Sequence, residues 1–173
     1  SGKEQPFIQQ HYKNFSSMSW VYSCGAGANY GTALESALKM GETIHIPSCC
    51  YEIEEYIHGP NLQLTPQYNV IFFDGNDGAS RRVEQVYKAT RKVTNRAYLI
   101  SNNPQLSSDD HVLSLSDTVS SELSPLVYLP FVQLLSFIVS NDLHSIYQHP
   151  LLKEFKAIAA AKTENFVNYD GDD

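Results

Sequence analysis

Residues 20–60 read WVYSCGAGANYGTALESALKMGETIHIPSCCYEIEEYIHGP, and this stretch decides the fold expected for the chain. The apolar residues 20–24 run into Gly25-Ala26-Gly27, which predicts a buried strand followed by a turn that needs positive φ or close backbone approach. From Asn29 onward, apolar residues recur at helical spacing, which predicts an amphipathic helix packed on that strand. A second strand is expected at 43–47. The stretch therefore predicts the strand–helix–strand unit from which parallel sheets are built.

The rest of the chain extends this unit in the same alternating order. A short acidic helix or turn is expected at 51–57, further strands at 68–73, 96–100 and 112–115, and further helices at 7–15, 79–93, 123–147 and 151–161. Alternating strands and helices predict an α/β fold, a doubly wound parallel five-stranded sheet with helices on both faces and right-handed crossovers. Ligands of such sheets bind beyond the carboxyl ends of the strands. We expect residues 25–29 and 48–58 at that edge.

Composition restricts the partners of the chain. Its 173 residues suffice for one well-cored domain, and 18% charged residues are typical of a soluble globular protein; only residues 170–173 are expected to form an acidic disordered tail. A net charge of −7 without a basic cluster argues against nucleic acid or an anionic membrane as partner. The longest apolar run, residues 126–139, is short for a bilayer and predicts a buried helix instead. No signal-peptide pattern opens the chain, so we expect a cytoplasmic protein.

Two cofactor or metal interpretations have weak support in the sequence. The Gly25-x-Gly27 turn suggests a dinucleotide site, but the third glycine is one position late and the second expected strand lacks a terminal acidic residue. A tight turn that binds nothing fits as well. A metal site from His45, Cys49, Cys50 and His58 matches no common zinc spacing. We therefore expect no cofactor and no metal, and three reduced cysteines.

The candidate acid/base residues lie at the end of the first helix and at the turn after the acidic segment. Glu35, Lys39 and Glu42 are four and three residues apart, so their side chains can meet on one face. A solvated surface ion pair is the simpler interpretation of that spacing. However, Glu42 sits where the negative end of the helix dipole disfavours a charged carboxylate, which suits a general base. His58 precedes Gly59-Pro60, a rigid place for a proton donor or acceptor, although a lone histidine is often structural.

The motifs in residues 25–60 resemble the second sugar isomerase (SIS) domain of glucosamine-6-phosphate synthases and fructosamine-6-phosphate deglycases. The shared pattern stands here as Gly25-Ala26-Gly27, then ALESALK at residues 33–39, then Glu42, and EYIHGP at residues 55–60. The resemblance continues more loosely at residues 125–135. It implies a flavodoxin-like three-layer SIS domain that forms most of this chain.

The same resemblance implies roles for individual residues. Glu42 would move a proton between C1 and C2 of an open-chain sugar phosphate, and His58, from the neighbouring subunit of a dimer, would help to open the ring. Lys39 would stabilise developing charge and Glu35 would support the group, with Gly25 and Gly27 in the binding region. Lys162 is a candidate for the lysine that forms an imine with the ketose in the synthases. The segment 149–151 is closer to the deglycase branch, which needs no such imine.

The phosphate-binding Ser/Thr-rich loop of the family is missing from this sequence, because no Ser-x-Ser-Gly-x-Thr segment occurs. That loop belongs to the first SIS domain, so residues 1–173 are expected to be a single SIS domain, the C-terminal half of a two-domain protein that forms a homodimer or higher homo-oligomer. The expected function is a ketosamine 6-phosphate isomerase or deglycase, with two alternatives: the isomerase half of a synthase-like aminotransferase, and a non-catalytic sugar-phosphate-binding module.

Overall fold

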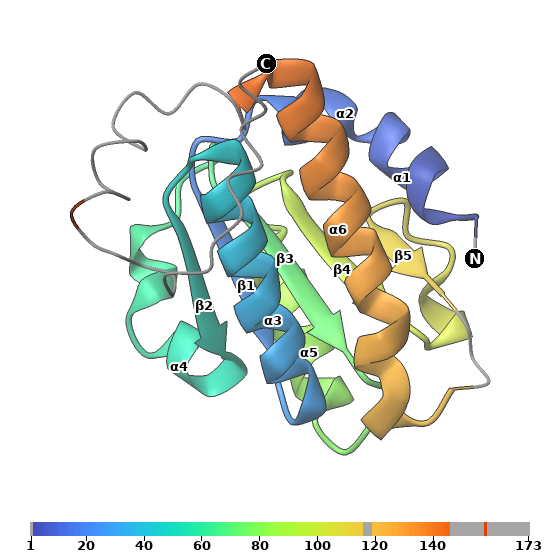
Figure 1. Ribbon diagram of the computed structural model, residues 1–173. Coiled ribbons are helices and arrows are strands. Elements are labelled where there is room, and N and C mark those ends of the chain that lie inside the picture. Colours follow the sequence, from blue (N-terminus) through green and yellow to red (C-terminus); the bar gives the residue numbers. More distant parts are fainter. Residues whose placement is uncertain (1, 116–118, 146–157, 159–173) are drawn as a thin grey trace.

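A parallel five-stranded sheet forms the centre of the computed structural model, which describes residues 2–115, 119–145 and 158 (Figure 1). The strand order is β2-β1-β3-β4-β5, and every neighbouring pair is parallel. The strands span Val21–Gly25 (β1), Ser48–Glu52 (β2), Asn69–Asp74 (β3), Ala97–Ser101 (β4) and Val112–Ser114 (β5). The predicted doubly wound sheet is confirmed. Because the winding reverses direction between β1 and β3, the switch point of the sheet lies there.

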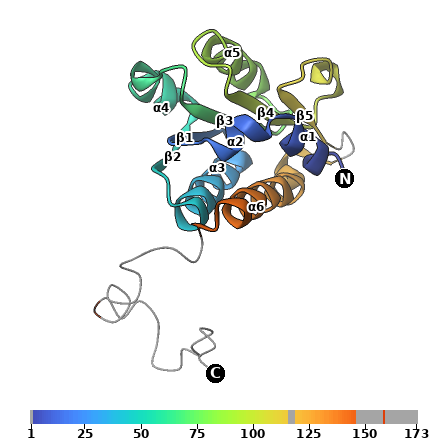
Figure 2. The same ribbon diagram turned by 90° about the horizontal axis from the view of Figure 1, so that it is seen from above.

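Helices cover both faces of the sheet (Figure 2). One face carries α3 and α6, with α1 and α2 beside α6, and the other carries α4 and α5. The helices span Glu4–Gln10 (α1), Tyr12–Ser16 (α2), Ala28–Lys39 (α3), Ile53–Ile57 (α4), Ser80–Thr90 (α5) and Ser124–Leu143 (α6). Short helical turns span Met40–Ile44 (η1), Pro60–Gln63 (η2), Pro104–Leu106 (η3) and Ser121–Leu123 (η4). The result is a three-layer sandwich.

The alternation of side chains along β3 divides the core into two clusters. Ile71 and Phe73 point toward α3 and α6, whereas Val70 and Phe72 point toward α4 and α5. All six residues of β3 are buried, as expected for a central strand covered on both faces. Full burial of side chains of this size contributes about 1.5–3 kcal/mol each, so the sheet is a rigid support for the loops at its edges.

The strand predicted at 43–47 is wrong. Residues 40–44 instead form η1, a π-helical turn that continues α3, and β2 begins only at Ser48. The β-branched residues in this segment suggested a strand, but the chain first widens its last helical turn and then reverses at His45, whose φ of 61° is left-handed. Glu42, predicted in the last turn of the helix, therefore lies in a π turn that continues α3.

Other predicted elements are confirmed with shifted ends. The helix expected at 7–15 is two short helices, α1 and α2, and the acidic helix begins at Ile53, after β2 has ended. The helix expected at 123–147 ends at Leu143. The helix predicted at 151–161 and the acidic tail at 170–173 lie outside the described residues, apart from Ile158.

Helix α6 and the turn before it, Ser121–Leu143, are long and apolar enough by length and composition to cross a membrane. Its packing identifies it as a core helix: Tyr128, Phe131, Val132 and Leu135 are fully buried in the cluster that α6 shares with β3 and β4. A sheet-packed helix of this kind passes the same composition test as a membrane span. The predicted buried helix is thus confirmed, although it is longer than the apolar run suggested.

Candidate functional site

The side chains of Glu35, Lys39 and Glu42 meet at the end of α3, as predicted. Lys39 forms an ion pair and hydrogen bond with Glu42, and its Nζ lies 3.5 Å from Glu35 Oε1. The side chains of these residues are between 29% and 45% exposed, so the cluster is open to a ligand but is partly shielded from water. The hydrogen bond that Lys39 donates to Glu42, together with the charges of both carboxylates, raises the pKa of Lys39 above its ordinary value. A permanent cation thus lies between two carboxylates.

The π turn η1 holds Glu42 in this cluster. The Thr43 hydroxyl donates a hydrogen bond to the Lys39 carbonyl oxygen at 2.7 Å, which fastens the turn to the end of α3. π-helical turns are rare and occur frequently at functional sites. The spacing of Glu35, Lys39 and Glu42 alone predicts their meeting, but it does not reveal this wider turn.

His58, the histidine predicted to transfer protons, follows the last residue of α4. Its Nδ1 lies 2.6 Å from the Glu54 carbonyl oxygen, so Nδ1 carries the proton and donates. In the neutral ring, Nε2 then holds the lone pair and can act as a base or accept a hydrogen bond. A capping box between Glu52 and Glu55 starts α4, and Arg82 binds Glu54 through two hydrogen bonds of 2.6 and 3.1 Å. The histidine is exposed but is held on a fixed turn.

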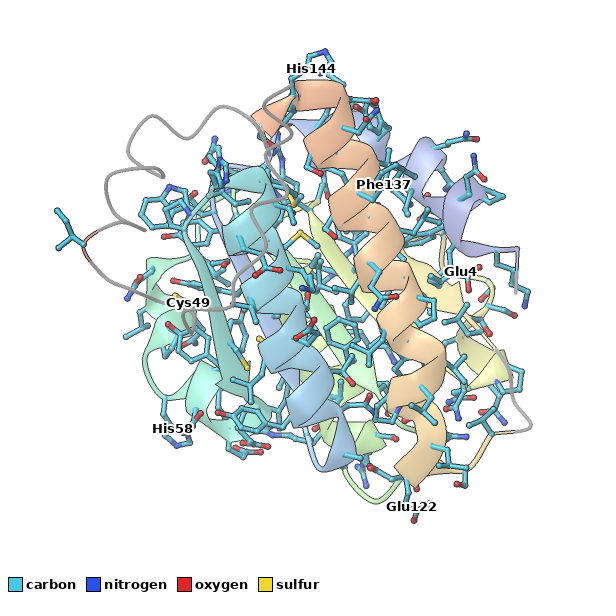
Figure 3. All side chains as sticks on the ribbon, in the orientation of Figure 1. Glu4, Cys49, His58, Glu122, Phe137 and His144 are labelled. Atoms are coloured by element: carbon cyan, nitrogen blue, oxygen red, sulfur yellow. The ribbon has the colours of Figure 1, made fainter. Side chains whose placement is uncertain are left out.

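One chain does not bring His58 and Glu42 together. His58 follows β2 and α4 at the carboxyl edge of the sheet, as Figure 3 shows, whereas Glu42 lies beyond the C-terminus of α3, at the amino edge. The two are separated by about the length of α3, whose 12 residues span roughly 18 Å. The expectation that residues 48–58 share one edge is also wrong at Ser48, which begins β2 at the amino edge.

Gly25 and Gly27 shape the turn before α3. A side-chain carbon at Gly25 would lie 2.3 Å from the Asn29 carbonyl oxygen, so only glycine lets the helix approach the strand this closely. Gly27 has a φ of 54°, the left-handed region that favours glycine. Both glycines therefore have structural roles at the carboxyl edge, at the far end of α3 from Glu42.

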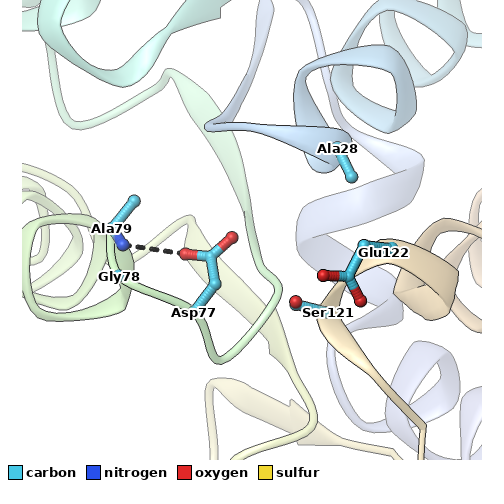
Figure 4. A pocket seen from close by; sticks show the side chains of 6 residues that line it. All are labelled: Ala28, Asp77, Gly78, Ala79, Ser121 and Glu122. Carbon is cyan, nitrogen blue, oxygen red and sulfur yellow. Dashed lines mark hydrogen bonds between the residues drawn. The ribbon is translucent and has the colours of Figure 1, made fainter.

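A cavity of about 400 Å³ lies beside this turn and was not predicted (Figure 4). Its lining includes Ala28 at the start of α3, Asp77 in the loop after β3, and Glu122 in η4. In Figure 4 the carboxylates of Asp77 and Glu122 both face the space between these loops. The sequence contained one signal for this cavity. The turn-rich residues 74–78 follow a central strand, so they must lie at the carboxyl edge, where ligands of such sheets bind.

A buried carboxylate lies behind this cavity, at the end of β3. Asp74 is 1% exposed and accepts hydrogen bonds from the hydroxyls of Ser80 and Ser101 and from the Asn76 N–H. The Tyr128 hydroxyl donates to the Asp74 carbonyl oxygen at 2.6 Å. These bonds link β3, β4, α5 and α6, so the loop that carries Asp77 is rigidly supported.

The structure disfavours the dinucleotide and metal interpretations. The carboxylate of Asp77 lies close to Gly27, where a dinucleotide pyrophosphate would meet α3, and would repel it. No group of three or more metal-binding side chains occurs among residues 2–115, 119–145 and 158. Exposed Cys49 and half-buried Cys50 are free thiols in β2, and His45 and His58 lie at opposite edges of the sheet. Lys162 lies outside the described residues.

The fold is the one expected for an SIS domain, and comparison with known proteins supports that resemblance. The chain is 31% identical over 144 residues to the glutamine–fructose-6-phosphate aminotransferase (isomerizing) of Methanothermobacter thermautotrophicus, which covers 81% of this chain and 24% of that protein. It is 28% identical over 135 residues to the enzyme of the same name from Xylella fastidiosa, covering 77% of this chain and 22% of that protein. The chain thus spans about a quarter of the length of these relatives. No family model matches the chain.

Solved structures share the fold. A candidate phosphosugar isomerase from Clostridium difficile superposes with a TM-score of 0.78 at 22% identity, over 95% of this chain and 46% of that one. The C-terminal domain of glucosamine-fructose-6-phosphate aminotransferase from Francisella tularensis superposes with a TM-score of 0.69 at 22% identity, over 79% of this chain and 39% of that one. The resemblance drawn from residues 25–60 is confirmed: the chain has the SIS fold and is related in sequence to the isomerizing aminotransferases.

Proposed function

We propose that this chain is the C-terminal SIS domain of an enzyme that acts on ketosamine 6-phosphates by transferring a proton between C1 and C2 of the sugar. The observation that carries the proposal is the Lys39 ammonium held between Glu35 and Glu42 at the open end of α3. Removing a proton next to a carbonyl or imine requires a positioned carboxylate and a cation that stabilises the enediol-like intermediate. The cluster provides both groups on one rigid helix end.

In this proposal Glu42 is the base, Lys39 stabilises the developing negative charge, and Glu35 orients Lys39. Proton transfer needs Glu42 as a free acceptor, so Lys39 must shift its hydrogen bond from Glu42 toward the substrate oxygen when the sugar binds. His58 would open the sugar ring with Nε2 as its reactive nitrogen. Because His58 and Glu42 lie at opposite edges of one sheet, His58 would have to come from a second copy of the chain.

Two partners complete the proposed site. A first SIS domain in the same protein would supply the phosphate-binding loop, and a homodimer would bring His58 to the Glu42 of its partner. We expect this assembly to be cytoplasmic. The negative net charge and the acidic cavity beside α3 support a phosphate site elsewhere, because Asp77 and Glu122 would repel a phosphate at that cavity.

The reaction outcome distinguishes two enzymes. A deglycase would release a free amine and a hexose 6-phosphate, and is preferred because of the sequence at residues 149–151. An isomerase half of a synthase would instead convert fructose 6-phosphate and ammonia into a 2-amino aldose 6-phosphate and water, with Lys162 as the candidate imine-forming lysine. The names of the sequence relatives favour this second outcome. The intact protein is incubated with fructosamine 6-phosphate and, separately, with fructose 6-phosphate and ammonia. Release of amine in the first reaction supports the deglycase, and an amino sugar phosphate in the second supports the synthase half.

The proposal is tested by Glu42→Gln with Glu84→Gln as matched control. Glu84 forms a similar surface pair with Lys88 on α5, at 3.3 Å, away from the proposed site. Loss of a general base costs about 10²–10⁴-fold in kcat, so E42Q should lose turnover at that scale while its thermal unfolding stays unchanged. E84Q should keep wild-type turnover. Near-normal turnover by E42Q would remove Glu42 from the mechanism.

A non-catalytic sugar-phosphate sensor is the second candidate. It is favoured by the lining of two cavities among the described residues: the cavity beside α3, and a second of about 310 Å³ between α4 and α5 whose lining includes Tyr56 and Val86. Neither is lined by Glu42 or His58. Calorimetry with fructose 6-phosphate and glucose 6-phosphate, beside the turnover assay, separates the candidates. Binding without turnover would support the sensor, and turnover that is lost in E42Q would exclude it.

A further inference from the structure

Two hydroxyl groups from separate parts of the chain hold the π turn that carries Glu42. The Thr43 hydroxyl, within the turn, donates to the Lys39 carbonyl oxygen at 2.7 Å. The Ser145 hydroxyl donates to the Thr43 carbonyl oxygen, also at 2.7 Å. Ser145 follows the left-handed His144 that ends α6, and it lies 102 residues from Thr43 in the sequence. The end of α6 is therefore hydrogen-bonded directly to the turn.

Ser48, the first residue of β2, supplies a third hydroxyl that binds next to the turn. The Ser48 hydroxyl donates to the Ala37 carbonyl oxygen, in the last turn of α3. A side-chain carbon at Gly41 would lie 3.1 Å from this hydroxyl, so the turn packs closely against Ser48. A widened turn is an irregularity that persists only where its surroundings specify it. These three hydroxyls, together with the burial of Met40 and Ile44 in the core, specify the turn among the described residues.

Glu42 lies in the middle of η1, so its position depends on how the backbone of this turn is held. Side chains three residues apart already share one face of a helix, so the contact between Lys39 and Glu42 needs this helix end to stay ordered. Helix ends fray where their backbone groups lack partners, and fraying would release the Glu42 carboxylate from Lys39. The hydroxyls bind backbone carbonyl oxygens in and beside the turn, so they oppose this fraying and keep the carboxylate against Lys39.

We infer that Thr43 and Ser145 are positioning residues, which hold the π turn so that Glu42 meets Lys39 and which couple the end of α6 to that pair. The kinetic part of this inference rests on the proposed function, but the structural part does not. Both hydroxyls act on the backbone. The Thr43 hydroxyl binds the carbonyl oxygen of Lys39, and the Ser145 hydroxyl binds the carbonyl oxygen of Thr43.

The test uses variants that remove each hydroxyl and variants that keep it. Thr43→Val and Ser145→Ala lack the donor, whereas Thr43→Ser and Ser145→Thr retain it. Ser136→Ala is the matched control, because its hydroxyl donates to the Gln133 carbonyl oxygen within α6 and does not contact the turn. The readout is the pKa of Lys39, followed by NMR of the lysine side chain in the 173-residue chain. This readout needs no substrate.

We expect T43V and S145A to lower the pKa of Lys39 toward its ordinary value, because the hydrogen bond to Glu42 is the main cause of its elevation. T43S, S145T and S136A should keep the wild-type value. In the intact protein, T43V and S145A should lose about 10- to 100-fold in kcat with little change in KM, as expected for a misplaced catalytic group.

An unchanged Lys39 pKa in folded T43V and S145A would overturn the inference, as would an equal shift in S136A. If T43V does not fold, the S145A and S145T pair decides. If the wild-type protein shows no turnover, the proposed function fails, but the pKa comparison still decides whether the hydroxyls position Glu42. A pKa shift without any change in kcat would keep the structural role and reject the catalytic one.

Discussion

Gly25 is the residue on which the close packing of α3 against β1 depends most directly. Replacing it with alanine would place a carbon 2.3 Å from the Asn29 carbonyl oxygen, a backbone atom that cannot move without shifting the helix. We expect Gly25→Ala to destabilise the fold by about 3 kcal/mol, near the upper end for overpacking. Gly31→Ala is the control, since nothing lies within 4 Å of its new carbon, and it should raise stability by up to about 1 kcal/mol. Urea unfolding measures both.

His111 is a residue whose environment makes stability depend on pH. Its Nδ1 lies 3.1 Å from both the Ala97 carbonyl oxygen and an Arg91 Nη, and its ring stacks on Tyr98 and lies 4.5 Å from the His11 ring. Burial, and then the charges of Arg91 and His11, lower the pKa of His111 from its ordinary 6.5. Well above pH 6.5 the ring is neutral in both the folded and the unfolded chain, so it has little effect on stability there.

As the pH falls below 6.5, the unfolded chain binds a proton that the folded chain resists, so stability falls until the lower folded pKa is reached. We expect the urea midpoint to fall between pH 7.5 and 5.5, and His111→Gln to reduce that decrease. An identical decrease in H111Q and wild type would show that other groups cause it.

Helix α6 is the element that joins the core to the candidate site. Its inner face fills the cluster behind β3, and its end is hydrogen-bonded to η1 through Ser145. Leu135→Ala should cost about 2–5 kcal/mol of unfolding free energy, as for other large-to-small changes in a core. Leu126→Ala, on the outer face and 68% exposed, should change it by less than about 0.5 kcal/mol. Equal effects in urea unfolding would contradict the assignment of α6 as a core helix.

Residue patterns predicted the elements well where a pattern has only one physical solution. The glycine turn, α3 and the central strand β3 were all predicted, because close approach, helical spacing and continuous burial each leave few alternatives. The segment after Lys39 was not, because β-branched residues are common in strands and a π turn has no sequence signature. The meeting of Glu35, Lys39 and Glu42 survived that error, since η1 continues α3 and spacings of four and three residues bring the side chains to one face of a helix.

The cavity between Ala28, Asp77 and Glu122 was missed for a different reason. Its lining comes from three loops that are distant in sequence, and only the strand order shows that they meet at the switch point. The acidic side chains that line it could be identified in the sequence, but their convergence could not. The distance between His58 and Glu42 was likewise visible only once the direction of α3 relative to β2 was known.

At the scale of the whole molecule, the opposite placement of His58 and Glu42 makes the proposed site dependent on assembly. In a two-fold symmetric dimer, each site would combine Glu42 of one copy with His58 of the other. A protein with Glu42→Gln in every copy has no intact site, and neither does one with His58→Ala in every copy. A dimer with one copy of each variant has one intact site and one site that lacks both groups.

Mixing the two inactive variants under conditions that exchange subunits should therefore restore turnover. Random exchange makes half of the dimers mixed, each with one of two sites intact, so activity should reach about a quarter of the wild-type value. The control takes each variant alone through the same subunit exchange, and its turnover should stay absent. If the mixture stays inactive while mass spectrometry shows mixed dimers, Glu42 and His58 do not act across the subunit boundary. His58 would then have no route to the proposed base, because within one chain it lies at the opposite edge of the sheet.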